Sequence, residues 1–160
     1  MSKKDIILEA LENRIKNIRI GDNVNLPSGD IYTYQNEIGY IDRQFINLTR
    51  EQVETAPMPF VLINNYHEDI KTLIGFDMVH KVILDIVGFV KVKNDNEKLD
   101  TEMNKLQNDL LVAILLNGNL DNTCDFIVPV SITTVDEMIY PYGGFQIRVV
   151  AEYSTKGLNF

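Results

Sequence analysis

The sequence predicts an α+β domain in which two helices pack on one face of a mostly antiparallel sheet of four or five strands. Two segments, Lys3 to about Ile18 and about Asp95 to Leu116, each carry a single apolar stripe at helical spacing. Strand-like segments separated by Gly, Pro and Asn lie between and after them. The order of helix, three strands, helix and two strands, without a repeat or linker, predicts one layered domain over residues 1–160.

The first helix begins at a capping signal, because the Ser2 hydroxyl can accept from Asp5, whose carboxylate can accept in return. Its apolar positions are Ile7, Leu11, Ile15 and Ile18. Turn-forming residues in Gly21–Asp30 then predict a loop that continues to about Gln35. The second helix has its stripe at Leu99, Met103, Leu106, Leu110, Ala113 and Ile114, and it ends at Gly118.

Three segments between the helices have strand patterns. Glu37–Phe45 alternates, and Phe60–Ile63 is a continuous apolar run that we extend through Tyr66. His80–Val92 is apolar on both faces and is predicted to be a central strand, in which Gly88 marks a bulge or a close approach by a neighbour. A helical turn is expected within the polar segment Asn47–Ala56, and a long connector over His67–Val79.

The last two strands are expected at Cys124–Asp136 and Phe145–Tyr153. The residues from about Ser154 to Phe160 have turn character, and we expect them to form a mobile tail.

Composition excludes several classes of function. The 15 basic and 23 acidic residues give a net charge of −8, which argues against nucleic-acid wrapping and anionic membrane surfaces. The single cysteine cannot form a disulfide within the chain. The longest apolar runs, such as Leu110–Leu116, are far shorter than a membrane span, and Lys3 and Lys4 precede an amphipathic pattern rather than a signal peptide. We therefore expect a soluble protein.

One cluster of residue types resembles a metal site. It consists of His67, Glu68 and Asp69, with Asp77 and His80 nearby. Because these residues lack the fixed spacing of known metal motifs, a solvated polar loop is the favoured interpretation, and we expect no metal and no cofactor.

The other reactive residue types also favour structural roles. Cys124 opens an apolar strand far from either histidine, so a buried thiol is favoured over a nucleophile. Asp85, inside the strongest strand, is either an acid with a raised pKa or, by preference, a paired or hydrated charge. No helix follows Gly143 and Gly144, which excludes a phosphate loop. The scattered positions of Arg43, Arg50 and Arg148 form no basic stripe. We expect no catalytic site.

Four stretches together resemble the tail terminator, or tail-completion, proteins of long-tailed bacteriophages. They are the helix DIILEALENRIKNI, the proline-preceded strand PMPFVLINNY, the helix segment LDTEMNKLQNDLLVAILLNGNL and the closing SITTVDEMIYPYGGFQIRVVAEY. The resemblance covers nearly the whole chain in order and length, and is sharpest at Gly118–Leu120 and Ser131–Tyr153.

This resemblance implies a function in the virion. In that family a sheet is backed by two helices, and six copies close into a ring that caps the tail tube at its head-proximal end. The implied partners are further copies of the chain, the major tail tube protein and the neck or connector protein. DNA would only pass through the lumen, which suits an acidic chain. The implied location is the virion tail, assembled in the host cytoplasm, without a membrane partner.

Two alternatives stay open at this stage. One is a neck or head-completion protein that joins the connector to the tail. The other is a small enzyme or ligand-binding domain that uses His67, Asp69, Asp77 or His80. The mass of a ring in solution would separate the two virion proteins from the enzyme or binding domain.

The connector Tyr140–Gly144 is the predicted assembly loop. Pro141 fixes one backbone angle, and Gly143 and Gly144 permit positive φ and let a neighbouring backbone approach closely. Tyr140 and Tyr142 would supply amphipathic contact area of the kind enriched at interfaces. The alternative is a hairpin turn whose tyrosines pack on their own domain.

Overall fold

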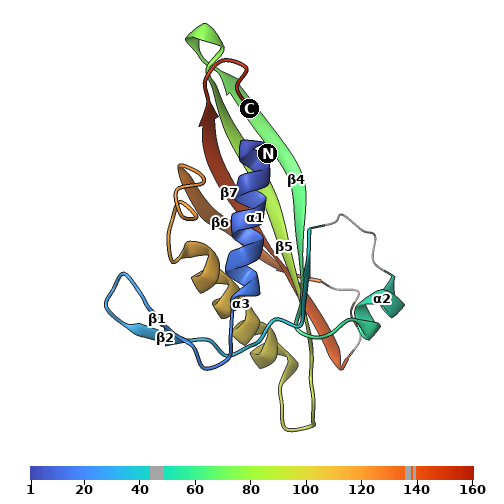
Figure 1. Cartoon of the computed structure of the whole chain (residues 1–160). Coiled ribbons are helices and arrows are strands. Elements are labelled where there is room, and N and C mark those ends of the chain that lie inside the picture. The colour runs from blue at the N-terminus through green and yellow to red at the C-terminus, as the bar shows by residue number, and fades with distance from the viewer. Residues whose placement is uncertain (44–48, 136–137, 139) are drawn as a thin grey trace.

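A mixed sheet of five strands is the centre of the computed structural model, which describes residues 1–43, 49–135, 138 and 140–160 (Figure 1). The strand order is β3-β4-β5-β7-β6. The bounds are Tyr40–Asp42 for β3, Phe60–Thr72 for β4, Met78–Lys91 for β5, Phe126–Thr134 for β6 and Tyr142–Thr155 for β7. Only β3 runs parallel to its neighbour, so the predicted α+β fold with a mostly antiparallel sheet is confirmed.

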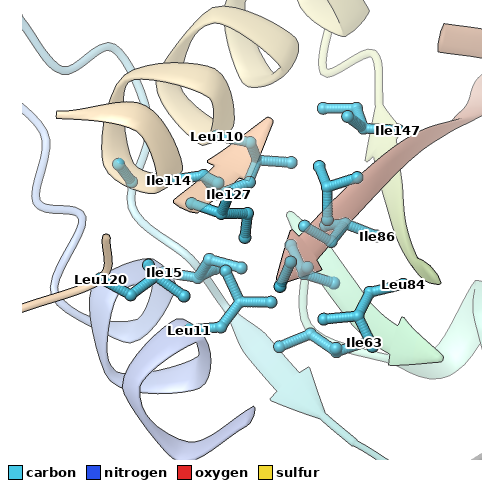
Figure 2. Close-up of a cluster of buried hydrophobic side chains, with 14 of the residues drawn as sticks. Leu11, Ile15, Ile63, Leu84, Ile86, Leu110, Ile114, Leu120, Ile127 and Ile147 are labelled. Carbon is cyan, nitrogen blue, oxygen red and sulfur yellow. The ribbon is translucent and has the colours of Figure 1, made fainter. Parts of the chain in front are cut away.

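The two long helices, α1 (Lys3–Lys16) and α3 (Leu99–Leu115), cover the same face of this sheet, as predicted. The capping box between Ser2 and Asp5 is present. Figure 2 shows the core that the helices and the sheet enclose. Its fully buried members include Leu11, Ile15, Leu84, Ile86, Leu110, Ile114 and Ile147. No helix in the described part of the chain is long and apolar enough to cross a membrane.

A third, short helix lies against the opposite face of the sheet. Side chains alternate along β4, so Val61 and Ile63 join the main core while Phe60 and Leu62 point the other way. There they meet Val53 of α2 (Arg50–Thr55) in a smaller apolar cluster. The helical turn expected in the polar segment before Pro57 is therefore a capped helix with its own packing surface.

The predicted loop before Gln35 contains a small hairpin. Its strands β1 (Asn23–Asn25) and β2 (Ile31–Thr33) pair antiparallel. A buried carboxylate on α3 holds the end of this hairpin: Asp109 accepts from the hydroxyl of Tyr32 at 2.6 Å and from the amide of Gln35. The sequence prediction of an unstructured loop was wrong because this anchor lies far along the chain.

The long connector predicted over His67–Val79 is also absent. Strand β4 continues to Thr72, a short 3-10 turn η1 (Ile74–Phe76) follows, and β5 begins at Met78. These strands form a hairpin that projects past the start of α1 (Figure 1). A bulge interrupts its pairing between Asn65 and His67.

Several predicted boundaries shift as well. Helix α3 begins at Leu99 rather than near Asp95, and β3 is confined to the middle of the predicted strand Glu37–Phe45, whose last two residues lie outside the described ranges. Strand β7 includes Ser154 and Thr155, which were assigned to the tail, and the Thr155 side chain is buried.

Gly88 marks a close approach rather than a bulge. Pairing on both sides of it is regular. A Cβ atom at Gly88 would lie 2.6 Å from Cζ of Phe145 and 3.1 Å from a methyl group of Leu106. The missing side chain therefore makes room for the largest fully buried side chain of the core.

Candidate functional site

The predicted assembly loop is only partly a loop. Tyr142, Gly143 and Gly144 belong to β7, and Tyr140 lies before it, joined to Pro141 by a cis peptide bond. The Tyr140 side chain is 60% exposed. Tyr142 packs on its own domain instead, because its hydroxyl donates to the carbonyl of Glu54 at 3.3 Å and its ring lies 5.4 Å from Nζ of Lys91.

The two glycines do not use the positive φ that they permit. Both have strand backbone rather than positive φ. A Cβ atom at Gly143 would lie 2.8 Å from a methyl group of Leu99, and one at Gly144 would lie 2.9 Å from the ring of Phe89. These glycines therefore admit side chains of their own domain. Of the predicted loop, Tyr140 is the residue that presents a large surface to solvent.

The residues considered for a metal site are divided between the two faces of the sheet. His67 contacts Asp69 at 2.8 Å on the face away from α1, whereas Glu68 and His80 lie on the α1 side. Asp77 accepts from the backbone of Gly157. Within the ranges that the structure describes, no group of three or more His, Cys, Asp or Glu side chains is placed to hold a metal ion.

Glu68 and His80 instead belong to a buried polar network. The imidazole of His80 contacts Glu68 at 3.0 Å and the hydroxyl of Thr155 at 3.0 Å, and it stacks on Tyr153 with ring centroids 4.4 Å apart. Glu68 also accepts from Lys4 at 2.7 Å and from Tyr153 at 2.9 Å. The network thus ties the start of α1 to β4, β5 and β7.

Two pKa values in this network are shifted. Burial opposes ionisation of Glu68, but its hydrogen bonds with Lys4, Tyr153 and His80 outweigh burial and lower the pKa of the carboxyl. Burial, followed by the hydrogen bond to Glu68, raises the pKa of the Tyr153 hydroxyl. At neutral pH the network therefore holds a carboxylate and a neutral phenol.

Cys124 is a buried thiol, as the sequence indicated. Burial raises the pKa of this thiol to about 11, so it is protonated at neutral pH. A shallow depression of about 350 Å³ opens beside it and is also lined by Lys3, Ile6 and Tyr153. Asp125 also lines the depression, and its negative charge raises the pKa of the thiol further rather than lowering it.

Asp85 is a paired charge on the face of the sheet opposite α1 and α3. Its carboxylate accepts two hydrogen bonds from the guanidinium of Arg148, at 2.9 and 3.1 Å. The same guanidinium lies 4.3 Å from the ring centroid of Tyr66. Arg43 is likewise paired, with Glu12 at 2.9 Å. These contacts account for Asp85 and Arg148 structurally.

Edge strand β6 carries exposed apolar side chains along its length, a feature that its sequence pattern did not predict. They are Phe126, Val128, Val130 and Ile132. Its outer edge is poorly suited to pair with another strand. The amide of Ile127 already donates to the carbonyl of Gly118 at 2.8 Å, Pro129 lacks an amide on the same side, and a bulge follows.

A second exposed apolar group, here called the apolar end, caps the projecting hairpin. It consists of Leu73, Phe76 and Leu158. The hydrogen bond from Gly157 to Asp77 holds Gly157 against the hairpin tip. The last residue lies below the tip, because the carbonyl of Phe160 accepts from the amide of Lys3, and Figure 1 shows the two chain ends close together. Phe76 is 71% exposed and has a φ angle of 65°. An aromatic residue held in this disfavoured conformation and turned to solvent is typical of a functional contact.

A small hollow lies at the other end of the sheet, where β4 begins. We call it the β3–α2 pocket. Its volume is about 230 Å³, and it is lined by Tyr40, Asp42, Gln52, Ala56, Pro57, Phe60 and Leu62. The rings of Tyr40 and Phe60 stack with centroids 5.2 Å apart, which gives the pocket a flat aromatic wall.

The chain matches no protein-family model and no curated protein sequence. Its candidate functional surfaces are therefore defined by geometry. They are the apolar end at one extreme of the sheet, the β3–α2 pocket at the other, and the exposed side chains of β6.

Proposed function

We propose that this protein is a structural component of a bacteriophage tail. In this proposal six copies, the number that the family resemblance implies, close into a ring that caps the tail tube, stops its polymerisation and presents a docking surface to the head connector. The observation that carries the proposal is the apolar end, because Leu73, Phe76 and Leu158 are 46%, 71% and 75% exposed close to the hydrogen bond that joins Gly157 to Asp77.

Two further features support an assembly role. Exposed apolar surfaces lie at distinct places on one subunit, which suits the heterologous contacts that close a ring. The net charge of −8 suits a lumen through which DNA slides, because phosphates are repelled rather than bound.

The decisive experiment measures mass and activity together. Sedimentation of the purified 18.3 kDa chain, alone and with tail tubes, should give a closed oligomer rather than a monomer or an open series. Electron microscopy should show a ring at one end of each tube, and added protein should stop tube elongation. A chain that stays monomeric with tubes present and does not bind tube ends would refute the proposal.

The same assay distinguishes a tail terminator from a neck or head-completion protein. A neck or head-completion protein would bind purified connectors and leave the elongation of bare tubes unchanged. A terminator must act on tubes in the absence of heads.

A further inference from the structure

We infer that Phe76 of one copy inserts into the β3–α2 pocket of the next copy, so that subunits join head to tail. This inference rests on the self-association in the proposed function and names the contact that would produce it. The Phe76 side chain, here called the knob, and the β3–α2 pocket, here also called the hollow, lie at opposite ends of one subunit.

The knob is prepared for insertion by its backbone. Gly75 and Phe76 both have positive φ, at 79° and 65°, and this turn directs the Phe76 ring away from its own domain. The hairpin beneath it is held by regular pairing of β4 with β5 from His67 to Thr72 and by the contact between Asp77 and Gly157. A rigid support of this kind lowers the entropy lost on docking.

The hollow fits an aromatic side chain better than a free ligand. Its volume of about 230 Å³ is below the roughly 300–1,000 Å³ that is usual for small-molecule sites. Tyr40 and Phe60 supply a stacked aromatic wall, and Leu62, Ala56 and Pro57 supply apolar contacts. An aromatic ring set against these groups would gain both burial and ring-to-ring contact.

The distance between knob and hollow requires that they belong to different copies. The pocket lies at Phe60, where β4 begins, and Phe76 lies beyond its end at Thr72. Thirteen residues of extended strand separate the two levels by about 40 Å at roughly 3.3 Å per residue. Figure 1 shows the hairpin tip at the top and α2 at the right, below the middle of the molecule. Contacts between unlike ends repeat from copy to copy and close a ring when the rotation between copies allows it.

Cross-linking tests the contact directly. Cysteines replace Leu73, beside the knob, and Gln52, at the pocket, in a Cys124→Ala background that keeps Phe76 intact. A short bis-maleimide should then give a ladder of covalent oligomers up to the closed ring. The control pair Leu73→Cys and Ile31→Cys, with Ile31 exposed on the β1–β2 hairpin, should give at most dimers.

A variant of the knob supplies the second test. Phe76→Asn removes the ring, and asparagine tolerates positive φ, so the fold should persist. The contact should weaken about 30-fold, which at 1.4 kcal/mol per tenfold corresponds to about 2 kcal/mol, a usual loss for an aromatic anchor. Ile31→Asn is the matched control and should leave assembly unchanged.

The outcomes separate this inference from the proposed function. Two results would overturn the inference and leave the terminator proposal standing. One is that Phe76→Asn forms rings as strongly as the parent. The other is that the protein with cysteines at positions 73 and 52 forms rings but gives no ladder of cross-linked oligomers. A parent protein that neither self-associates nor caps tubes overturns both. A ladder from the test pair, together with lost rings in Phe76→Asn and intact rings in Ile31→Asn, supports the inference.

Discussion

The hydroxyl of Tyr32 donates to Oδ1 of Asp109 at 2.6 Å, although the two residues are 77 positions apart. Asp109 is completely buried on α3, and it also accepts from the amide of Gln35 and the side chain of Asn36. A buried carboxylate surrounded by donors in this way fixes the β1–β2 hairpin to the helix layer. Burial, and then this hydrogen bond, raises the pKa of the Tyr32 hydroxyl.

Asp109→Asn should destabilise the protein by about 2–3 kcal/mol, because the new amide brings donors to a site that already holds donors. Chemical denaturation measures the loss. Hydrogen exchange should show faster opening of the β1–β2 hairpin than of β5. Asp95→Asn, at an exposed position before α3, is the control and should change stability by less than about 0.5 kcal/mol. Equal stability of the two variants would contradict the prediction.

Glu68→Gln should cost about 1–2 kcal/mol at pH 7, because the charged acceptor for Lys4 and Tyr153 is lost. The folded pKa of Glu68 lies below its usual value of 4.5, so its contribution is complete above that pH and declines as the pH falls through the folded pKa. The stability difference between parent and variant should therefore shrink below pH 4.5. Denaturant melts from pH 7 to pH 3 measure it, with Glu9→Gln on the exposed side of α1 as the control. A difference that is constant over this range would exclude the mechanism.

Gly88→Ala should destabilise the core by about 1–3 kcal/mol through overpacking, because the added methyl group would meet Phe145 at 2.6 Å. Gly118→Ala is a matched control, since no heavy atom lies within 4 Å of a Cβ atom at that position. Thermal melting of the two variants tests the comparison. A Gly88→Ala protein that melts with the parent would mean that Phe145 relaxes freely.

The two tyrosines of the predicted assembly loop should behave differently. Tyr142→Ala should lower the stability of the subunit by about 1–3 kcal/mol, because it removes the contacts with Glu54 and Lys91. Tyr140→Ala should leave stability within about 0.5 kcal/mol. If the exposed ring of Tyr140 contributes to assembly, that variant should weaken ring formation or tube capping. Circular dichroism and sedimentation separate the two effects, and full assembly by Tyr140→Ala would remove Tyr140 from the interface.

Side-chain patterns predicted the buried elements well. The apolar stripes of α1 and α3 and the apolar run of β5 face a core on at least one side. The spacing of their apolar residues therefore predicts which side chains are buried. The second half of β4 is different. His67, Asp69 and Lys71 lie where few side chains cover them, and the strand is held by backbone bonds to β5 that leave no apolar signal.

The candidate functional surfaces were harder to predict because they combine distant segments. The β3–α2 pocket joins β3, α2 and β4, and the apolar end joins the hairpin tip to the C-terminal residues. Phe76 was placed in a connector, although the Gly75–Phe76 pair is a local turn signal that could have marked it. At Gly143 and Gly144, close packing on Leu99 and Phe89 accounts for two glycines whose residue type also suits a turn.

The interrupted outer edge of β6 affects how strongly free subunits tend to aggregate. An exposed apolar edge strand is a template for fibril growth, and a protein produced in excess inside a cell meets its own copies at high concentration. Here the bond from Ile127 to Gly118, the missing amide of Pro129 and the bulge after it interrupt that template. Apolar side chains can therefore remain available on β6 while backbone recruitment into amyloid-like stacks is suppressed.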